Sequence, residues 1–526
     1  MNSTKILHAF VFVVSLLGAL ALSITVFTAG GNNLGSVFLY IFTPLSFILA
    51  LTNPKIGFWI LVFCGAYLDF VKRLMILERG ISYEHISSIL AMPPAIVCGI
   101  SANLFFGMIV KKTKWEPWQT RVFIACFIWM ILGTFISGGY ASGMRGIGDV
   151  VNFVAYPFLL LTIPKLFNSV ESIRKAMITI IVIYIPVGLY AIWQSIYGLS
   201  DLETDYLLSG FSVVDQVLSE RKLRVFSTMG GPSQLGMVAI GLLVIVLAPV
   251  SLRGKFGILH LFNPLRLLIA AVFFLAVSST YVRAAWLTGG ASLLIFLVIR
   301  YKITSYFFYV AGIIAAFSLY AAAPYLLKNN FMLEWTESSM SVDSKNATDE
   351  EMQTKNLTTF NTRLKGMSEI ATDSSLWTPF GMAVSKGRAA DGMLIHDFVT
   401  RTLISVGYIP LTFIILSLIV AAFALLRFNG RLYPSAEVNM FRLFVALSLA
   451  SLVVMPIGEK NLFTFPTNLM HSIYMSFALG LYIYSIRLPL RSRVPQSLAE
   501  PVPTVATGLR RGSNPSPVRG GRTHMG

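Results

Sequence analysis

Charged residues are scarce in this chain. Asp, Glu, Lys and Arg together make up 12% of the sequence, whereas ordinary globular proteins carry about 25%. Hydrophobic residues make up 55%, and the mean hydropathy is +0.72. So few charges cannot cover the surface of a water-soluble fold. The composition therefore predicts an all-α polytopic membrane protein, in which each spanning helix needs about 20 apolar residues.

The sequence also lacks the motifs of common cofactor and metal sites. It contains no Walker A pattern, HExxH, CxxC, GxSxG or EF-hand loop. The three cysteines, Cys64, Cys98 and Cys126, lie in apolar segments without metal-ligand spacing. We therefore expect no metal site and no cofactor.

The chain has 41 Lys and Arg residues and 24 Asp and Glu residues, which gives a formal net charge of +17. The positive residues are scattered over short loops and a basic tail and form no single stripe, so we expect no nucleic-acid partner. The positive-inside rule for membrane proteins accounts for the excess.

About fourteen apolar segments are long enough to span a membrane. The sixth, ninth and tenth are short or uncertain, and we leave open whether they span fully. The segments are approximately 6–28, 35–52, 56–71, 86–110, 121–138, 147–164, 175–197, 232–251, 267–282, 284–299, 304–326, 396–426, 436–457 and 463–486.

The loop charges predict the orientation of these spans. Basic residues gather in the loops after spans two, four, six and twelve, which all fall on one side of the membrane. The positive-inside rule makes that side cytoplasmic and places both termini there. The loop after span three is an exception, because Lys72, Arg73 and Arg79 would face outward.

The spans divide the chain into four regions. Residues 1–326 hold spans one to eleven, and 327–395 form a large, partly helical periplasmic loop before helix 12. Residues 396–486 hold spans twelve to fourteen. The Pro- and Arg-rich tail, 487–526, is expected to be a disordered cytoplasmic extension that is attracted to membrane lipids.

Arg283 is the only charged residue in the apolar run from Leu267 to Ile299. An arginine at membrane depth costs about 2.5–3.5 kcal/mol even on the most lenient scale. Basic residues flank the run on both sides, so both of its ends are expected to be cytoplasmic. The chain must then enter the membrane and return. We expect Arg283 at the turn, on the outer surface, where a lipid-linked phosphate would lie.

Other cations are predicted close to the same surface. Arg145 lies between spans five and six, and Arg363 lies in the large loop. Arg221 and Arg224 precede Gly230-Gly231-Pro232, where a helix start adds backbone donors for an anion. Arginine suits bidentate contact with phosphate. Each of these residues can instead be a loop residue, or one that snorkels to the interface.

His396 is the candidate general base, at the point where the large loop re-enters the membrane. Imidazole can accept a proton from a sugar hydroxyl near neutral pH. The alternative is that His396 only caps a helix at the interface.

The order of these residues resembles the O-antigen ligase and O-antigen (exopolysaccharide) polymerase superfamily of bacterial integral membrane glycosyltransferases. The similarity covers roughly residues 145–460. The matching pieces are Arg224-Val-Phe-Ser-Thr-Met-Gly-Gly-Pro, Val282-Arg283-Ala-Ala-Trp286-Leu, and a large loop through Arg363, Trp377-Thr-Pro-Phe-Gly381, His396-Asp397 and Gly407.

The resemblance implies a metal-independent transfer of an undecaprenyl-pyrophosphate-linked glycan to an acceptor sugar hydroxyl on the periplasmic side of the bacterial inner membrane. It implies that Arg224 and Arg283, with Arg221, Arg363 and Arg145, bind the pyrophosphate and that His396 activates the acceptor. The partners would be the lipid-linked glycan, membrane lipids, and other polysaccharide export and assembly proteins.

Three departures from the family pattern weaken a ligase assignment, namely Val282-Arg283-Ala284 in place of Ser-Arg-Gly, Asp397 where Asn is common, and a glycine pair reduced to Gly381 and Gly387. Because the polymerases of the family are more divergent, these departures favour a polymerase. Two other classes stay open. A transporter or flippase of polysaccharide or lipid-linked oligosaccharide would also need many spans, but such folds are usually built from repeats, and none is visible. A non-catalytic membrane subunit would not require an intramembrane Arg283.

Overall fold

The computed structural model describes residues 38–76, 89–111, 115–137, 150–208, 218–219, 222–248, 264–300, 378–381, 398–430, 432, 435–454 and 464–486. The predicted spans 6–28 and 304–326 and the tail 487–526 lie outside these residues. The predicted loop 327–395 does as well, apart from residues 378–381.

Helices make up nearly all of the described structure, which confirms the all-helical prediction. The exception is a short antiparallel ribbon of β1, Leu218–Ser219, and β2, Lys222–Leu223. The helices are η1 (Phe38–Phe42), α3 (Thr43–Thr52), α4 (Pro54–Ile76), α6 (Met92–Lys111), α7 (Pro117–Ser137), η3 (Tyr156–Phe158), α9 (Leu159–Leu166), α10 (Val170–Tyr197), α11 (Asp201–Leu208), α13 (Pro232–Leu247), α14 (Pro264–Thr280), α15 (Arg283–Arg300), α19 (Phe398–Val406), α20 (Tyr408–Gly430), α21 (Ala436–Val454), α22 (Thr467–Leu481) and η7 (Tyr482–Ile486).

Five helical segments of the described part are long and apolar enough to cross a membrane, and several shorter apolar helices accompany them. The long segments are Pro54–Arg73, Pro117–Ile136, Val170–Tyr197, Arg283–Arg300 and Thr467–Ile486. Their lengths fit a helical membrane protein. The number of spans, the identity of the membrane and the side on which the termini lie stay predictions.

Two segments that we predicted as single spans are broken. The segment 396–426 divides into α19 and α20 at Gly407, whose φ of +89° lies in the left-handed region. Residues 378–381 pack against this break, where Tyr408 N donates to Thr378 O at 3.1 Å. A Cβ at position 407 would lie 2.3 Å from Pro379 O. The segment 147–164 is interrupted near Ala155, where the 3-10 turn η3 precedes α9.

The run from Leu267 to Ile299 forms two helices, α14 and α15, which meet at Tyr281 and Val282. Arg283 is the first residue of α15, so the run breaks at the position of its one charged residue, as predicted. Both helices pack against α13.

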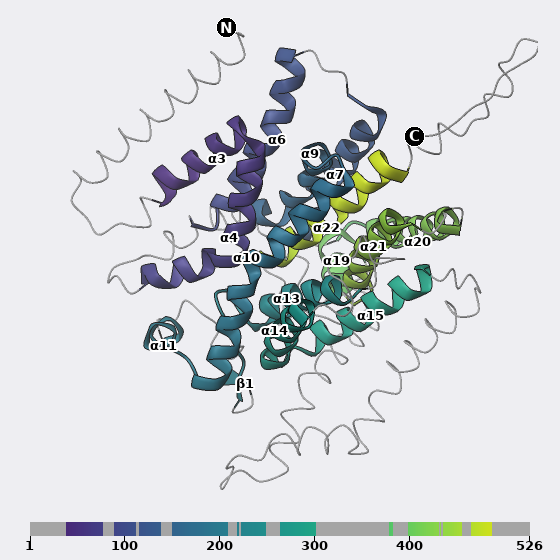
Figure 1. Cartoon of the computed structure of the whole chain (residues 1–526). Helices are drawn as coiled ribbons and strands as arrows, with labels where there is room; N and C mark the ends of the chain where they lie inside the picture. Colours follow the sequence, from purple (N-terminus) through teal and green to yellow (C-terminus); the bar gives the residue numbers. More distant parts are fainter. Residues whose placement is uncertain are drawn as a thin grey trace, which may run out of the picture.

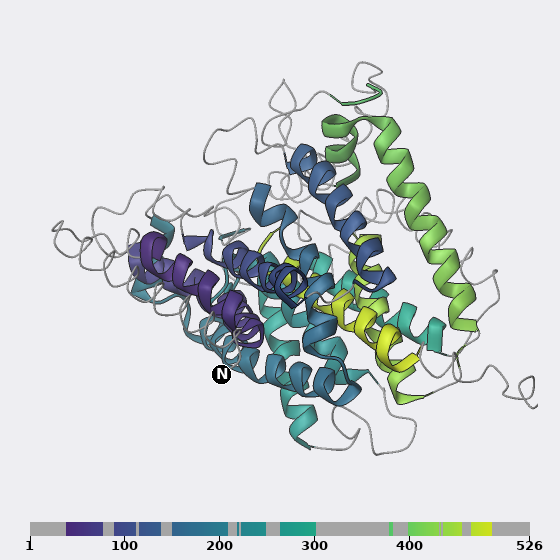
Figure 2. The same cartoon turned by 90° about the horizontal axis from the view of Figure 1, so that it is seen from above.

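Helix α13 lies at the centre of the bundle, surrounded by α14, α15 and α22 (Figures 1 and 2). Nearly all of its residues from Pro232 to Val246 are buried, as expected for a helix that is apolar on every side. Small residues allow close packing here. A Cβ on Gly289 of α15 would lie 2.4 Å from Ile240, and one on Gly241 would lie 2.9 Å from the Tyr474 hydroxyl.

The helix ends sort into two groups. The C-terminal ends of α4, α10 and α14 meet the N-terminal ends of α13 and α15 at one end of the bundle. We call this the Arg73 end; it includes Arg73, α11 and residues 222–231 and 279–283. Basic residues gather at the opposite end, namely Lys55, Lys165, Arg174, Lys175, Arg266 and Arg300.

Candidate functional site

The loop of residues 224–231, which leads into α13, begins against the end of α14. Arg224 Nε donates a hydrogen bond to Thr280 O at 3.1 Å, and Val225 N donates to Ser279 O at 3.3 Å. Arg283 follows three residues after Thr280 and is exposed. The structure thus brings Arg224 to the turn that carries Arg283, at the Arg73 end of the bundle.

The turn between α14 and α15 is closed by its own polar groups. Thr280 Oγ1 donates to Val277 O at 2.7 Å and accepts from Val282 N at 3.3 Å. Tyr281 has a φ of +53°, an outlier for a bulky side chain. In the described part of the chain, the one other non-glycine residue with positive φ is Ser227, in the loop beside this turn. Strained backbone of this kind clusters at functional sites.

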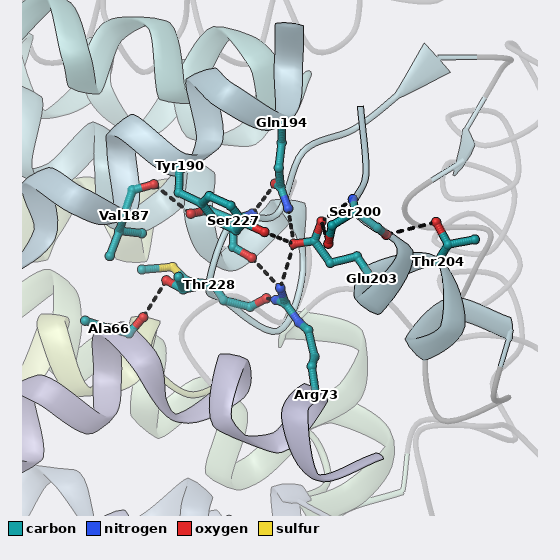
Figure 3. Close-up of polar contacts among 11 residues, drawn as sticks. Ala66, Arg73, Val187, Tyr190, Gln194, Ser200, Glu203, Thr204, Ser227 and Thr228 are labelled. Carbon is teal, nitrogen blue, oxygen red and sulfur yellow. Dashed lines mark hydrogen bonds and ion pairs between the residues drawn. The ribbon is translucent and has the colours of Figure 1, made fainter. Parts of the chain in front are cut away.

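The second half of the loop is held by Arg73, which is 1% exposed. Its guanidinium group donates to the main-chain oxygens of Ser227 and Met229 and forms an ion pair with Glu203, whose nearest oxygen is 3.4 Å away (Figure 3). The ring of Phe226 lies beside the guanidinium, with its centroid 4.3 Å from Cζ. Arg73 therefore joins α4 to both the loop and α11.

Glu203 is fully buried and receives hydrogen bonds at both carboxylate oxygens. Oε1 accepts from Tyr190 at 2.9 Å and from Gln194, and Oε2 accepts from the amide and the hydroxyl of Ser200, both at 3.0 Å. Gln194 Oε1 in turn accepts from Ser227 N at 2.7 Å. A buried charge is tolerated when it is paired and hydrogen-bonded, and this one is both.

Further contacts attach the loop to α4 and α10. Ser227 Oγ donates to Val187 O and Thr228 Oγ1 donates to Ala66 O, both at 2.6 Å (Figure 3). Gly230 lies against the Asp69 carboxylate, since a Cβ there would be 2.9 Å from Oδ2. The loop therefore has one defined position between α4, α10, α11 and α14.

This geometry also corrects the sequence prediction for Lys72 and Arg73. We expected them in a loop after a span ending at residue 71, but α4 continues to Ile76 and both residues are helical. Lys72 pairs with Asp69 at 2.7 Å, as Arg73 does with Glu203. Their charges are therefore neutralised locally, which explains the exception to the positive-inside pattern. Arg79 lies outside the described residues.

Most predicted site residues lie outside the described part of the chain. This holds for His396, Arg145, Arg221 and Arg363, whose roles stay predictions. Glu203 and Gln194 were not predicted as site residues, and Arg73 was considered only for its effect on the predicted orientation. Arg73 departs from the positive-inside rule, and this departure was the available signal that it has a buried partner.

A second polar feature is a small cavity among α13, α15, α21 and α22. Its volume is about 20 Å³, enough for about one water molecule. Thr288 and Ser292 of α15 and Thr467, His471 and Tyr474 of α22 line it. Thr467 Oγ1, His471 Nδ1 and the Tyr474 hydroxyl are buried and have no hydrogen-bond partner among the described residues.

The described residues also contain no cluster of three or more His, Cys, Asp or Glu that could bind a metal ion.

Comparison with known proteins finds no matching family model, no matching curated protein and no matching solved structure.

Proposed function

We propose that this protein transfers a glycan from undecaprenyl pyrophosphate to an acceptor sugar hydroxyl at the Arg73 end of the bundle, as an exopolysaccharide or O-antigen polymerase or ligase. The observation that carries the proposal is the hydrogen bond from Arg224 to Thr280 O, beside the turn where Arg283 begins α15. It supports a site in which two arginines from separate segments bind one diphosphate group.

The chemistry requires a stabilised leaving group. The acceptor oxygen attacks the anomeric carbon, the bond from that carbon to the pyrophosphate oxygen breaks, and undecaprenyl pyrophosphate leaves. Fixed guanidinium groups would stabilise the charge that develops on the leaving oxygen. In this proposal His396 takes the proton of the acceptor hydroxyl.

The site would face the periplasm of a bacterial inner membrane, with about fourteen spans and both termini in the cytoplasm. The described part supports this orientation in one respect. Basic residues such as Lys55 and Lys165 lie at the opposite end of the bundle, while the cations Lys72 and Arg73 are neutralised by Asp69 and Glu203.

The test is a transfer assay in vesicles that contain the purified full chain and lipid-linked glycans extracted from its host. The proposal predicts new glycosidic bonds and the release of undecaprenyl pyrophosphate. Glycan that stays at its original length, with no undecaprenyl pyrophosphate released, would contradict it.

A transporter or flippase is the second candidate, and the buried polar groups of Thr467, His471 and Tyr474 are the observation that favours it. A path for sugars needs polar side chains inside the bundle. The cavity that these residues line holds about one water molecule, so transport would require the helices around it to move apart. The same vesicles distinguish the two functions, since a flippase would move lipid-linked glycan across the bilayer without forming a new bond.

A further inference from the structure

We infer that Arg73 and Glu203 are positioning residues that hold loop 224–231 so that Arg224 lies at the α14–α15 turn. The role of Arg224 in binding a diphosphate rests on the proposed function. The geometry that holds the loop does not depend on it.

Burial distinguishes this pair from the other ion pairs. Of the four ion pairs in the described residues, Arg73–Glu203 is the one whose side chains are both 1% exposed or less. Arg174 and Lys175, which pair with Glu171, are far more exposed. A buried pair adds little net stability over apolar residues of similar size, so its presence calls for another role.

The bonds of the pair point to that role. If Arg73 only joined α4 to α11, the contact with Glu203 would suffice. Instead the guanidinium also binds two main-chain oxygens of the loop, and Glu203 holds Gln194, which binds the loop amide of Ser227. Both members of the pair therefore act on the same residues of the loop.

The held residues include a strained one. Ser227 has a φ of +53°, which a serine rarely adopts without support from its surroundings. Its amide, hydroxyl and carbonyl groups all bind α4 or α10 residues. If these bonds are lost, Ser227 is free to return to a relaxed conformation, and the chain on either side must turn with it. Arg224 is three residues away and would lose its place beside Thr280.

A cysteine reporter tests the geometry without any substrate. Ser279→Cys is a one-atom change at a site that is 8% exposed and whose carbonyl accepts from Val225 N. It would be placed in a chain whose Cys64, Cys98 and Cys126 are replaced by alanine and treated with a water-soluble maleimide. We expect labelling to be about tenfold faster when the loop is released, which corresponds to a modest shift in a local opening equilibrium.

Two variants release the loop by different routes. Gln194→Leu removes the bond to Ser227 N and keeps the ion pair, so it should fold even if changes at Arg73 or Glu203 do not. Arg73→Lys keeps the charge and loses the planar fork that reaches two carbonyls. Arg174→Gln is the matched control, because it removes one positive charge at the opposite end of the bundle, where its partner Glu171 is exposed.

A binding measurement then connects the loop to the proposed substrate. Undecaprenyl pyrophosphate is the probe, since every sugar donor of this class releases it, and undecaprenyl monophosphate is the comparison ligand. We expect Gln194→Leu and Arg73→Lys to weaken binding of the pyrophosphate by about tenfold. We expect Arg174→Gln to bind like the unmodified chain.

The outcomes distinguish the positioning role of Arg73 and Glu203 from the proposed function. Unchanged labelling of Ser279→Cys in both loop variants would overturn the positioning role. Faster labelling with unchanged binding would confirm that the loop is released and would overturn the role of Arg224 in binding the diphosphate. If the unmodified chain does not prefer the pyrophosphate to the monophosphate, the proposed function fails. The labelling result would then still decide whether Arg73 and Glu203 hold the loop.

Discussion

Arg224 Nε lies 3.1 Å from the main-chain oxygen of Thr280, and this hydrogen bond joins the loop before α13 to the turn before α15. Arg224 and Arg283 are far apart in the sequence, yet this contact brings them to the same end of the bundle. The contact uses one nitrogen of Arg224 and a backbone oxygen. It holds Arg224 beside the turn that precedes Arg283.

Arg283→Ala is expected to abolish long-chain glycan in the host while the protein still inserts in the membrane. Arg283→Lys should also impair the product, because lysine keeps the charge but loses the bidentate contact. Glycan length on gels measures both effects. Arg174→Ala, at the opposite end of the bundle and paired with exposed Glu171, is the control and should leave glycan length unchanged.

Glu203→Gln is expected to destabilise the fold by about 3–5 kcal/mol, because it leaves the Arg73 charge buried without a counter-charge. Thermal unfolding in detergent measures the loss. Glu171→Gln removes a carboxylate that is 56% exposed and should change stability by less than about 0.5 kcal/mol. Equal effects of the two substitutions would argue against a buried ion pair.

Gly289→Ala and Gly290→Ala are neighbouring changes in α15 with opposite expected results. A Cβ on Gly289 would lie 2.4 Å from Cγ1 of Ile240, and overpacking of this kind costs about 1–3 kcal/mol. A Cβ on Gly290 meets no heavy atom within 4 Å, so alanine there should be neutral or slightly stabilising. Comparing the unfolding temperatures of the two variants tests whether α13 and α15 pack as described.

Tyr474→Phe reports whether the cavity beside α22 holds water. If a water molecule bonds the Tyr474 hydroxyl, its removal should lower stability by about 1 kcal/mol. If the cavity is dry, the hydroxyl is an unsatisfied buried group and phenylalanine should raise stability instead. We expect the first result, since Thr467, His471 and Tyr474 offer a water several partners.

Much of the helical framework could be predicted from the sequence because it depends on local composition. Long apolar segments such as 175–197 correspond to helices, here α10, and the lone charge at position 283 marks the break between α14 and α15. The break at Gly407 was missed, although glycine is the residue that its positive φ requires. An apolar run conceals such a break, because the hydropathy of the two helices is continuous across it.

What the sequence alone determined is the class of the protein. Its low charge content and apolar segments of about 20 residues predict a helical membrane protein, since a helix satisfies its own backbone hydrogen bonds in lipid. Only the tertiary structure decided what Arg73 and Arg224 bind. Glu203 pairs with Arg73, and Thr280 O accepts from Arg224, across long stretches of chain. Such pairings depend on how helices pack, and no local pattern encodes them.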